Sequence, residues 1–150
     1  DGYDLETGGL TYAPPFHRPY DWERSGDQRL FSAMVTPGGL AEIKGYADGI
    51  GPWKPYIVRV QGQLDDAGRL KDINGDGKID LRDASTRNPT SLIADAHRMG
   101  LFVHAFTFRN ESRNLAQSYL GDPRAEYLQF FRLGVDGVFS EFPDTAISAR

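Results

Sequence analysis

The feature that most constrains the fold is a nearly uninterrupted apolar run from Leu101 to Phe108. A run of this length, bounded by glycine and polar residues, is typical of a strand buried on both faces of a parallel sheet. Side chains alternate along a strand, so the even-numbered residues from Phe102 to Phe108 are expected to share one face. A sheet that contains such a strand needs a covering layer on each side.

Helix and strand signals alternate around this run. The expected helices cover residues 36–47, 91–99 and 122–133, and the expected strands cover residues 56–60, 101–108 and 135–140. Thr36 and Asp122, each followed by proline, are typical of helix N-termini. The alternation predicts an α/β fold with parallel strands joined by helical crossovers. Because three strands and three helices cannot cover both faces of the central strand, the pattern fits a portion of a larger α/β barrel.

The segment before the first helix is rich in glycine and proline, with aromatic residues between them. This composition predicts a long ordered loop over residues 1–35. The first residue is Asp1 and no signal peptide is recognisable, so we expect either a processed protein or a piece of a longer chain.

Composition narrows the possible functions. The formal net charge is −4 and basic residues do not cluster, which argues against nucleic-acid binding. No apolar stretch approaches the roughly 20 residues that span a bilayer, so no membrane span is expected. The chain contains no cysteine, which excludes disulfides, thiol catalysis and cysteine-based zinc sites.

The sharpest local motif is the stretch from Asp72 to Asp83 (DINGDGKIDLRD). It resembles the twelve-residue EF-hand calcium loop, in which oxygen donors alternate along the chain and a glycine at position 6 permits a sharp turn. Gly77 occupies position 6, and Ile79 stands where an apolar residue usually anchors the loop in the protein interior. We predict a Ca²⁺ site, to which Lys78 contributes only its backbone carbonyl. The predicted ligands are Asp72, Asn74, Asp76, Lys78, Asp80 and Asp83.

The last position of the loop departs from the EF-hand pattern, because Asp83 stands in place of a longer glutamate. The calcium affinity is therefore left open, and an Asp- and Gly-rich surface turn that binds nothing is the alternative. A calcium sensor pairs two such loops, and no second loop is present in the sequence. The predicted role is that of a structural metal site, which orders an insertion over residues 61–89 between a strand and its helix.

Three further stretches carry a family resemblance: residues 36–52 (TPGGLAEIKGYADGIGP), 100–111 (GLFVHAFTFRNE) and 134–144 (GVDGVFSEFPD). In this order they resemble the sixth helix–strand region, the seventh strand and the closing strand of glycerophosphodiester phosphodiesterases, in their secreted and periplasmic bacterial branch. Glu141 stands where the family usually has aspartate, and Arg109 where the wider family often has asparagine.

The resemblance implies a TIM barrel that splits glycerophosphodiesters into glycerol 3-phosphate and an alcohol, using a divalent metal, usually calcium. Residues 1–150 would then be one partial domain, the C-terminal portion of the barrel with about three βα units. The family's catalytic histidines and catalytic metal ligands lie on the early strands, so this chain is expected to hold no catalytic residue and to be inactive alone. His17 and Arg18 are similar to the family's His-Arg-Gly motif, but Pro19 replaces the glycine.

Three residues are predicted to contact the substrate at the carboxyl ends of the strands, where barrel enzymes place their active sites. Phe106 matches an aromatic residue that lines the family's pocket. His104 lies deeper on the same face, and a structural core histidine is the alternative. Lys54 is placed to neutralise a phosphate, and a solvated surface lysine is the alternative. His97 lies on a helix and is expected in solvent outside the barrel.

The sequence therefore predicts part of a hydrolase that uses Ca²⁺ and acts on a small-molecule glycerophosphodiester. The N-terminal half of the barrel is expected either in cis or on a second chain. A non-catalytic calcium-dependent binding or structural module, and one chain of a split enzyme, stay open as alternatives. The family's bacterial branch and the use of calcium favour a secreted or periplasmic location.

Overall fold

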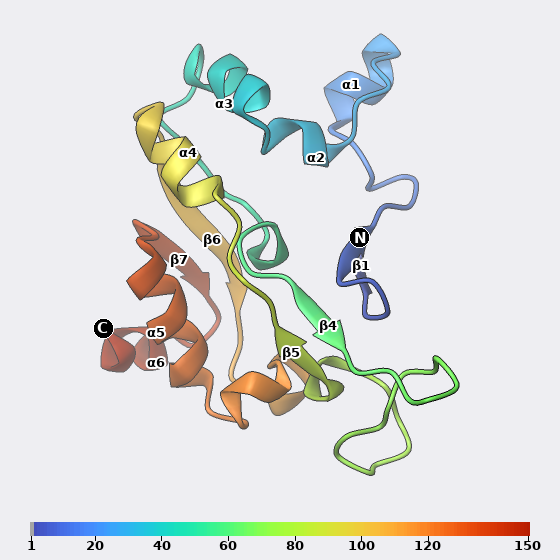
Figure 1. Ribbon diagram of the computed structural model, residues 1–150. Coiled ribbons are helices and arrows are strands. Elements are labelled where there is room, and N and C mark those ends of the chain that lie inside the picture. The colour runs from blue at the N-terminus through green and yellow to red at the C-terminus, as the bar shows by residue number, and fades with distance from the viewer. Residues whose placement is uncertain (1) are drawn as a thin grey trace.

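The centre of the fold is a three-stranded parallel sheet. The computed structural model describes residues 2–150. The sheet consists of β3 (Gly49–Ile50), β6 (Phe102–Phe108) and β7 (Gly137–Ser140), in the order β3-β6-β7. Both pairs of neighbouring strands are parallel. Figure 1 shows the arrows of β6 and β7 pointing the same way. The α/β organisation with parallel strands, predicted from the alternation of elements, is confirmed.

Four helices pack against one face of this sheet. They are α3 (Pro37–Lys44), α4 (Leu92–Arg98), α5 (Pro123–Leu133) and α6 (Pro143–Ala149). Two of them begin as predicted: the Thr36 side chain accepts a hydrogen bond from the Gly39 amide at 3.1 Å, and Asp122 accepts one from the Arg124 amide at 2.9 Å. None of the helices within residues 2–150 is long and apolar enough to cross a membrane.

The main hydrophobic core lies between these helices and β6. Phe108 is fully buried there, with its ring centre 4.8 Å from that of Tyr127 and 5.1 Å from that of Phe130. Stacked and edge-on aromatic pairs of this kind add to the free energy gained from burial alone. The other fully or nearly buried members of the core are Leu40, Ile43, Ile57, Val58, Leu92, Ile93, Ala96, Leu101, Val103, Ala105 and Ala149.

The opposite face of the sheet is exposed, and the expectation that β6 is buried on both faces is wrong for this chain. Phe102 is 58% exposed and Phe139, on β7, is 56% exposed; His104 and Phe106 are also exposed. The four helices all pack on the other side, which leaves these side chains to solvent. We call this surface the inner face.

The alternation of side chains changes near the end of β6. The pairing of β6 with β7 is irregular in register between Ala105 and Phe108. Phe108 consequently lies in the core with Ala105, and not on the same face as Phe102 as expected. A register irregularity of one residue transfers a side chain from one face of a strand to the other.

The strand expected over residues 56–60 is wrong. The chain forms the short β3 earlier and then a 3-10 helix, Lys54–Tyr56. Pro55 lies inside this 3-10 helix, where its fixed φ favours the turn, so the chain bends at the start of the predicted strand. Ile57 and Val58 therefore reach the core from a turn.

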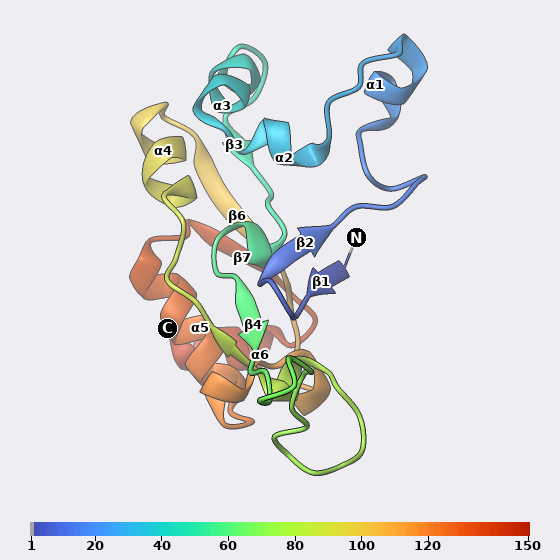
Figure 2. The ribbon, with the colours of Figure 1, turned by 45° about the vertical axis from the view of Figure 1, so that its right-hand side comes forward.

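The N-terminal segment holds more regular structure than the expected loop. β1 (Gly2–Asp4) and β2 (Gly9–Thr11) form an antiparallel hairpin, followed by α1 (Tyr20–Ser25) and α2 (Phe31–Met34). This regular structure is stabilised by local contacts, which leave no periodic pattern in the sequence. Asp4 accepts hydrogen bonds from Thr7 in the hairpin turn, and the Arg29 guanidinium lies 4.2 Å from the ring centre of Trp22. Figures 1 and 2 show α1 and α2 projecting away from the sheet.

The insertion starts and ends on a short antiparallel ladder beyond the carboxyl end of β6 (Figure 1). β4 (Val60–Gly62) pairs there with β5 (Ala84–Thr86). A second, smaller core joins this ladder to the 3-10 helices Leu81–Asp83, Ser112–Asn114 and Gln117–Tyr119; its buried members are Val60, Ala84, Leu115, Ala116 and Tyr119. The insertion is therefore packed at its base, while the rest of it extends away from the domain (Figure 2).

Asp136 connects the start of β7 to β6. Its Oδ2 accepts a hydrogen bond from the Val103 amide at 2.8 Å and lies 2.9 Å from His97 Nε2. Burial alone would raise the pKa of Asp136, but these hydrogen bonds and the nearby histidine charges outweigh it, so the pKa is lowered. His97 lies outside the sheet, as expected, and is paired with this carboxylate.

Two substitutions on β6 test the one-sided burial of the sheet. Phe108→Ala is expected to lower the free energy of unfolding by about 3–5 kcal/mol, because it empties a fully buried aromatic site. Phe102→Ala, on the exposed face of the same strand, is expected to cost less than about 1 kcal/mol. Urea unfolding of the 150-residue chain measures both, and equal losses at the two positions would show that the inner face is buried.

Asp136→Asn tests the connection between β6 and β7. Because the folded-state pKa of Asp136 is lowered, its contribution is fully present above the ordinary carboxyl value of about 3.9 and is lost as the pH falls through the folded-state value. The variant is expected to lose about 1–2 kcal/mol of unfolding free energy at pH 7 and to show a flatter decline below about pH 4. Urea unfolding over a pH series checks this, with Asp48→Asn, at a 94% exposed carboxylate, as the control. An unchanged pH slope in Asp136→Asn contradicts the assignment.

Candidate functional site

The carboxyl ends of the three parallel strands meet at one edge of the sheet. Ligand and active sites of parallel α/β folds lie at this edge. The chain brings Lys54 there after β3, Arg109 after β6 and Glu141 after β7. The β4–β5 ladder and the insertion lie beyond the same edge (Figure 1). We call this region the carboxyl edge.

Phe106 and His104 lie on the inner face, near the carboxyl edge. Phe106 is 37% exposed, and its backbone forms a parallel bridge with Trp53. A Cβ atom on Gly137 would lie 2.9 Å from His104 Cδ2, so only glycine at this position lets β7 approach the imidazole ring. His104 is exposed in this chain and is not the buried core histidine considered as the alternative.

An open apolar pocket of about 360 Å³ lies beside β3, and Phe106 forms part of its wall. A pocket of this volume is large enough for a small ligand. Gly49 and Ile50 of β3 also line it, and within residues 2–150 β3 pairs with β6 alone, so its other edge is suited to binding another strand. The other lining residues of the pocket are Phe31, Met34, Val35, Ile43, Tyr46, Ala47, Gly51, Pro52, Trp53 and Tyr56.

Lys54 lies at the carboxyl edge but is buried. Its side chain is 9% exposed, and Nζ lies 2.7 Å from Oε1 of Glu126 on α5, whose side chain is 7% exposed. Burial raises the pKa of Glu126, and the positive charge of Lys54 opposes that shift. Glu126 therefore neutralises the Lys54 ammonium in this structure. The phosphate contact expected for Lys54 stays a prediction.

An exposed ion pair joins the ends of β6 and β7. Nη2 of Arg109 donates to both carboxylate oxygens of Glu141, at 2.5 and 2.6 Å. At both positions the sequence differs from the residue that the family resemblance leads one to expect, and the structure makes the two side chains partners. An exposed pair of this kind contributes little to stability, about 0–1 kcal/mol.

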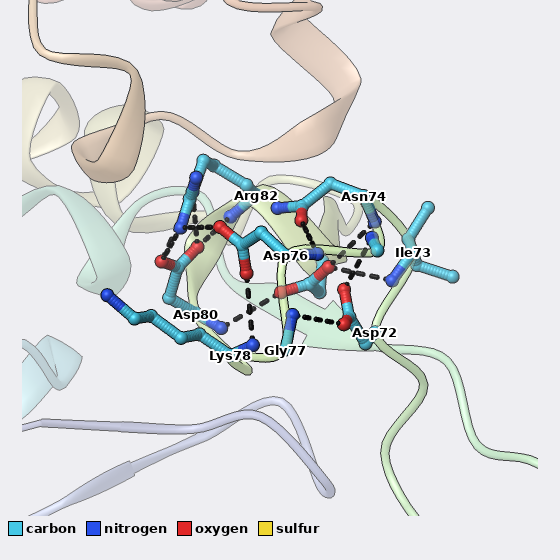
Figure 3. A network of polar contacts seen from close by, with 10 residues as sticks. Asp72, Ile73, Asn74, Asp76, Gly77, Lys78, Asp80 and Arg82 are labelled. Atoms are coloured by element: carbon cyan, nitrogen blue, oxygen red, sulfur yellow. Dashed lines mark hydrogen bonds and ion pairs between the residues drawn. The ribbon is translucent and has the colours of Figure 1, made fainter.

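The predicted calcium loop forms a tight turn within the insertion (Figure 3). Asp72 accepts hydrogen bonds from the Gly75 and Gly77 amides, each at 2.7 Å. Asn74 and Asp76 each accept one from the amide two residues further along the chain. Gly77 has a φ of 79°, which fits the sharp turn expected at this position and disfavours other residues.

Asp83 closes the loop. It is 2% exposed, and its Oδ1 accepts a hydrogen bond from the Ile73 amide at 2.8 Å while its Oδ2 accepts one from the Asp80 amide at 3.0 Å. Asp83 thus joins the two ends of the loop, from the position at which an EF-hand carries its last ligand. Ile79, expected to anchor the loop in the interior, is instead 42% exposed, because this part of the insertion extends away from the second core.

Arg82 is a counter-ion inside the loop. Its Nη2 lies 2.6 Å from Oδ2 of Asp76 and 2.5 Å from Oδ2 of Asp80. The hydrogen bond between Arg82 and Asp80 lowers the pKa of Asp80. Within residues 2–150, no three His, Asp or Glu side chains come together as a metal-binding group. The types of oxygen donor and their spacing along the loop are those of a calcium site. The carboxylates of Asp76 and Asp80, however, point toward Arg82 and not toward a common centre (Figure 3).

His17 and Arg18 lie apart from the carboxyl edge, in the turn before α1. Arg18 Nε donates to His17 Nε2 at 3.0 Å, and Arg18 Nη1 donates to the Asp27 carbonyl at 2.8 Å. Figure 1 shows α1 at the opposite end of the molecule from the insertion. Through these contacts the two residues stabilise the N-terminal segment around α1.

The sequence did not indicate the roles of three residues, two of them near the carboxyl edge and one, Asp136, at the opposite end of the sheet. Glu126 carries no motif, and its burial beside Lys54 depends on a contact 72 residues apart in the sequence. Arg82 occupies a non-ligand position of the loop. Asp136 lies inside the 134–144 stretch, so the family resemblance marked its neighbourhood without indicating its role.

Comparison with known proteins places the chain among phosphodiesterases. No family model matches it. It is 48% identical over 144 residues to Glycerophosphodiester phosphodiesterase GDPDL1 of Arabidopsis thaliana, a match that covers 94% of this chain and 16% of that protein. It is 34% identical over 115 residues to Glycerophosphodiester phosphodiesterase GDPD6 of the same plant, covering 76% of this chain and 25% of that protein. The chain thus spans a quarter or less of the length of these relatives. This chain therefore belongs to the glycerophosphodiester phosphodiesterase family, as a relative of a segment of its plant members.

Proposed function

We propose that this chain is the C-terminal portion of a TIM-barrel phosphodiesterase that hydrolyses glycerophosphodiesters to glycerol 3-phosphate and an alcohol. The observation that carries the proposal is the one-sided burial of the parallel sheet. All four covering helices pack on one face, while Phe102, His104 and Phe139 stay exposed on the other. A TIM barrel has this arrangement, with helices outside and the remaining strands closing the inner side. The similarity to plant phosphodiesterases over most of the chain supports it.

The remaining strands have a suitable docking place at β3. Within residues 2–150, β3 pairs with β6 on one side, and its other edge borders the apolar pocket. An additional strand that binds this edge would satisfy its backbone groups and bury the apolar wall. We propose that this strand belongs to the N-terminal half of the barrel, in cis or on a second chain. That half would also supply the acid, the base and the catalytic metal ligands.

Two side chains of this chain are proposed to contact the small-molecule substrate. Phe106 and His104 are exposed on the inner face near the carboxyl edge, where a barrel enzyme holds its substrate. Phe106 offers an apolar wall, and His104 offers a hydrogen-bonding ring. Lys54 is the third predicted contact, but a phosphate would have to compete with Glu126 for its ammonium group.

The insertion is proposed to bind one calcium ion. The ligands would be the side chains of Asp72, Asn74, Asp76, Asp80 and Asp83 and the backbone carbonyl of Lys78. Bound calcium would supply the positive charge that holds these oxygens together. For this, Asp76 and Asp80 have to turn away from Arg82. Because the base of the insertion packs on the second core, ordering the loop would also stiffen the carboxyl edge. A secreted or periplasmic compartment, where calcium is abundant, suits such a site.

Calcium binding is tested with the paired substitution Asp72→Ala and Asp76→Ala. Isothermal titration of the parent chain is expected to show about one site, and the double variant is expected to lose it. Asp66→Ala, in the same insertion but outside the loop, serves as the matched control and keeps the site. A parent chain that binds no calcium, or a double variant that binds as the parent does, contradicts the proposal.

The catalytic assignment is tested by completing the barrel. The 150-residue chain alone is expected to release no glycerol 3-phosphate from glycerophosphocholine, since the groups that perform the chemistry lie elsewhere. Fusion to the part of the 48% identical plant relative that precedes the matched region is expected to restore release. That preceding part alone is the control and should be inactive.

Ordinary turnover by the 150-residue chain alone would show that the catalytic groups are misplaced in this account. A folded fusion that binds calcium and stays inactive would favour a non-catalytic module instead.

A further inference from the structure

A small cavity lies next to the buried ion pair, apart from the exposed inner face. Its volume is about 10 Å³, and Lys54 and Glu126 both line it. Residues from several other parts of the chain also line it: Tyr3, Val58, Val60, Leu81, Asn114, Ala116, Tyr119 and Phe130. The cavity is thus a point at which the N-terminal hairpin, the insertion and α5 meet.

The pair leaves hydrogen-bonding capacity unused at this cavity. Oε2 of Glu126 is buried and has no hydrogen-bond partner among residues 2–150. Lys54 Nζ carries three N–H donors, and the hydrogen bond to Glu126 Oε1 uses one of them. A buried carboxylate oxygen without a partner is costly, because its hydration is lost and nothing replaces it. The unpartnered acceptor, Glu126 Oε2, therefore belongs to the carboxylate that binds Lys54 Nζ, a group with more N–H donors than this one hydrogen bond uses.

We propose that this cavity is a binding site for one water molecule, which donates to Glu126 Oε2 and accepts from Lys54 Nζ. The volume is close to the smallest that holds a water, about 10–15 Å³, and polar partners are present on both sides. The water replaces part of the hydration that the Glu126 carboxyl group loses on burial, and it bridges the two members of the pair. The bridged pair connects Lys54, which follows β3, to Glu126 on α5.

The site is tested by counting long-lived internal waters in the 150-residue chain by oxygen-17 magnetic relaxation dispersion. The paired substitution Lys54→Met and Glu126→Leu replaces the ion pair with apolar side chains of similar size. This variant is expected to hold one long-lived water fewer than the parent. The paired substitution Arg109→Met and Glu141→Leu removes the exposed ion pair at the same edge, and it is expected to leave the count unchanged.

An equal count in the parent and the Lys54–Glu126 variant overturns the proposal. If circular dichroism shows that this variant does not fold, Ala116→Val replaces it. Ala116 lines the cavity without carrying charge, so the larger side chain fills the space and leaves the pair intact. Loss of one long-lived water in Ala116→Val supports the site, and an unchanged count overturns it. Neither result depends on calcium binding or on phosphodiesterase activity.

Discussion

The structure depends on the burial of one face of the β3–β6–β7 sheet. Val103, Ala105 and Phe108 of β6 lie under α3, α4, α5 and α6, while Phe102, His104 and Phe106 face solvent. Covering one face supplies enough apolar burial to define a core. It also leaves an aromatic surface and a free strand edge that natural proteins usually cover. The fold of this chain and its proposed place in a larger barrel follow from this single asymmetry.

Three groups of charged side chains lie around the carboxyl edge, and the solvent exposure of each group decides how much it contributes to stability. The Arg109–Glu141 pair is exposed and contributes little to stability. The Lys54–Glu126 pair is buried, so either partner alone would leave an uncompensated charge in the interior. Arg82 neutralises two carboxylates inside the loop proposed to bind calcium, and so competes with the ion.

The sequence predicted correctly the helices that begin with a capping residue and the strand that is a continuous apolar run. Thr36 and Asp122 cap α3 and α5 as expected, and the run from Leu101 to Phe108 forms the central strand. The strand expected over residues 56–60 rested on hydrophobicity alone, whereas the chain turns in the 3-10 helix that contains Pro55 and enters a strand only at Val60. The hairpin and helices of the N-terminal segment were missed because turn contacts, and not a periodic pattern, hold them.

The candidate site was predictable only in part, for a related reason. Alternation along β6 put Phe106 and His104 on the inner face, and spacing alone put Gly77 at the sharp turn of the loop. The partners of Lys54 and Asp76 could not be read in this way. Glu126 reaches Lys54 only through the packing of α5 on the sheet, and Arg82 turns back on the loop from a position without a ligand role.

The proposal on which the other proposals depend is that this chain is one part of a larger barrel. Native mass spectrometry of the protein isolated from its source, without denaturant and with calcium present, tests this proposal. We expect these residues to occur in a longer polypeptide or in a complex with a second chain that carries the early strands. A stable species of 16.7 kDa alone, folded and active as a phosphodiesterase, would contradict it.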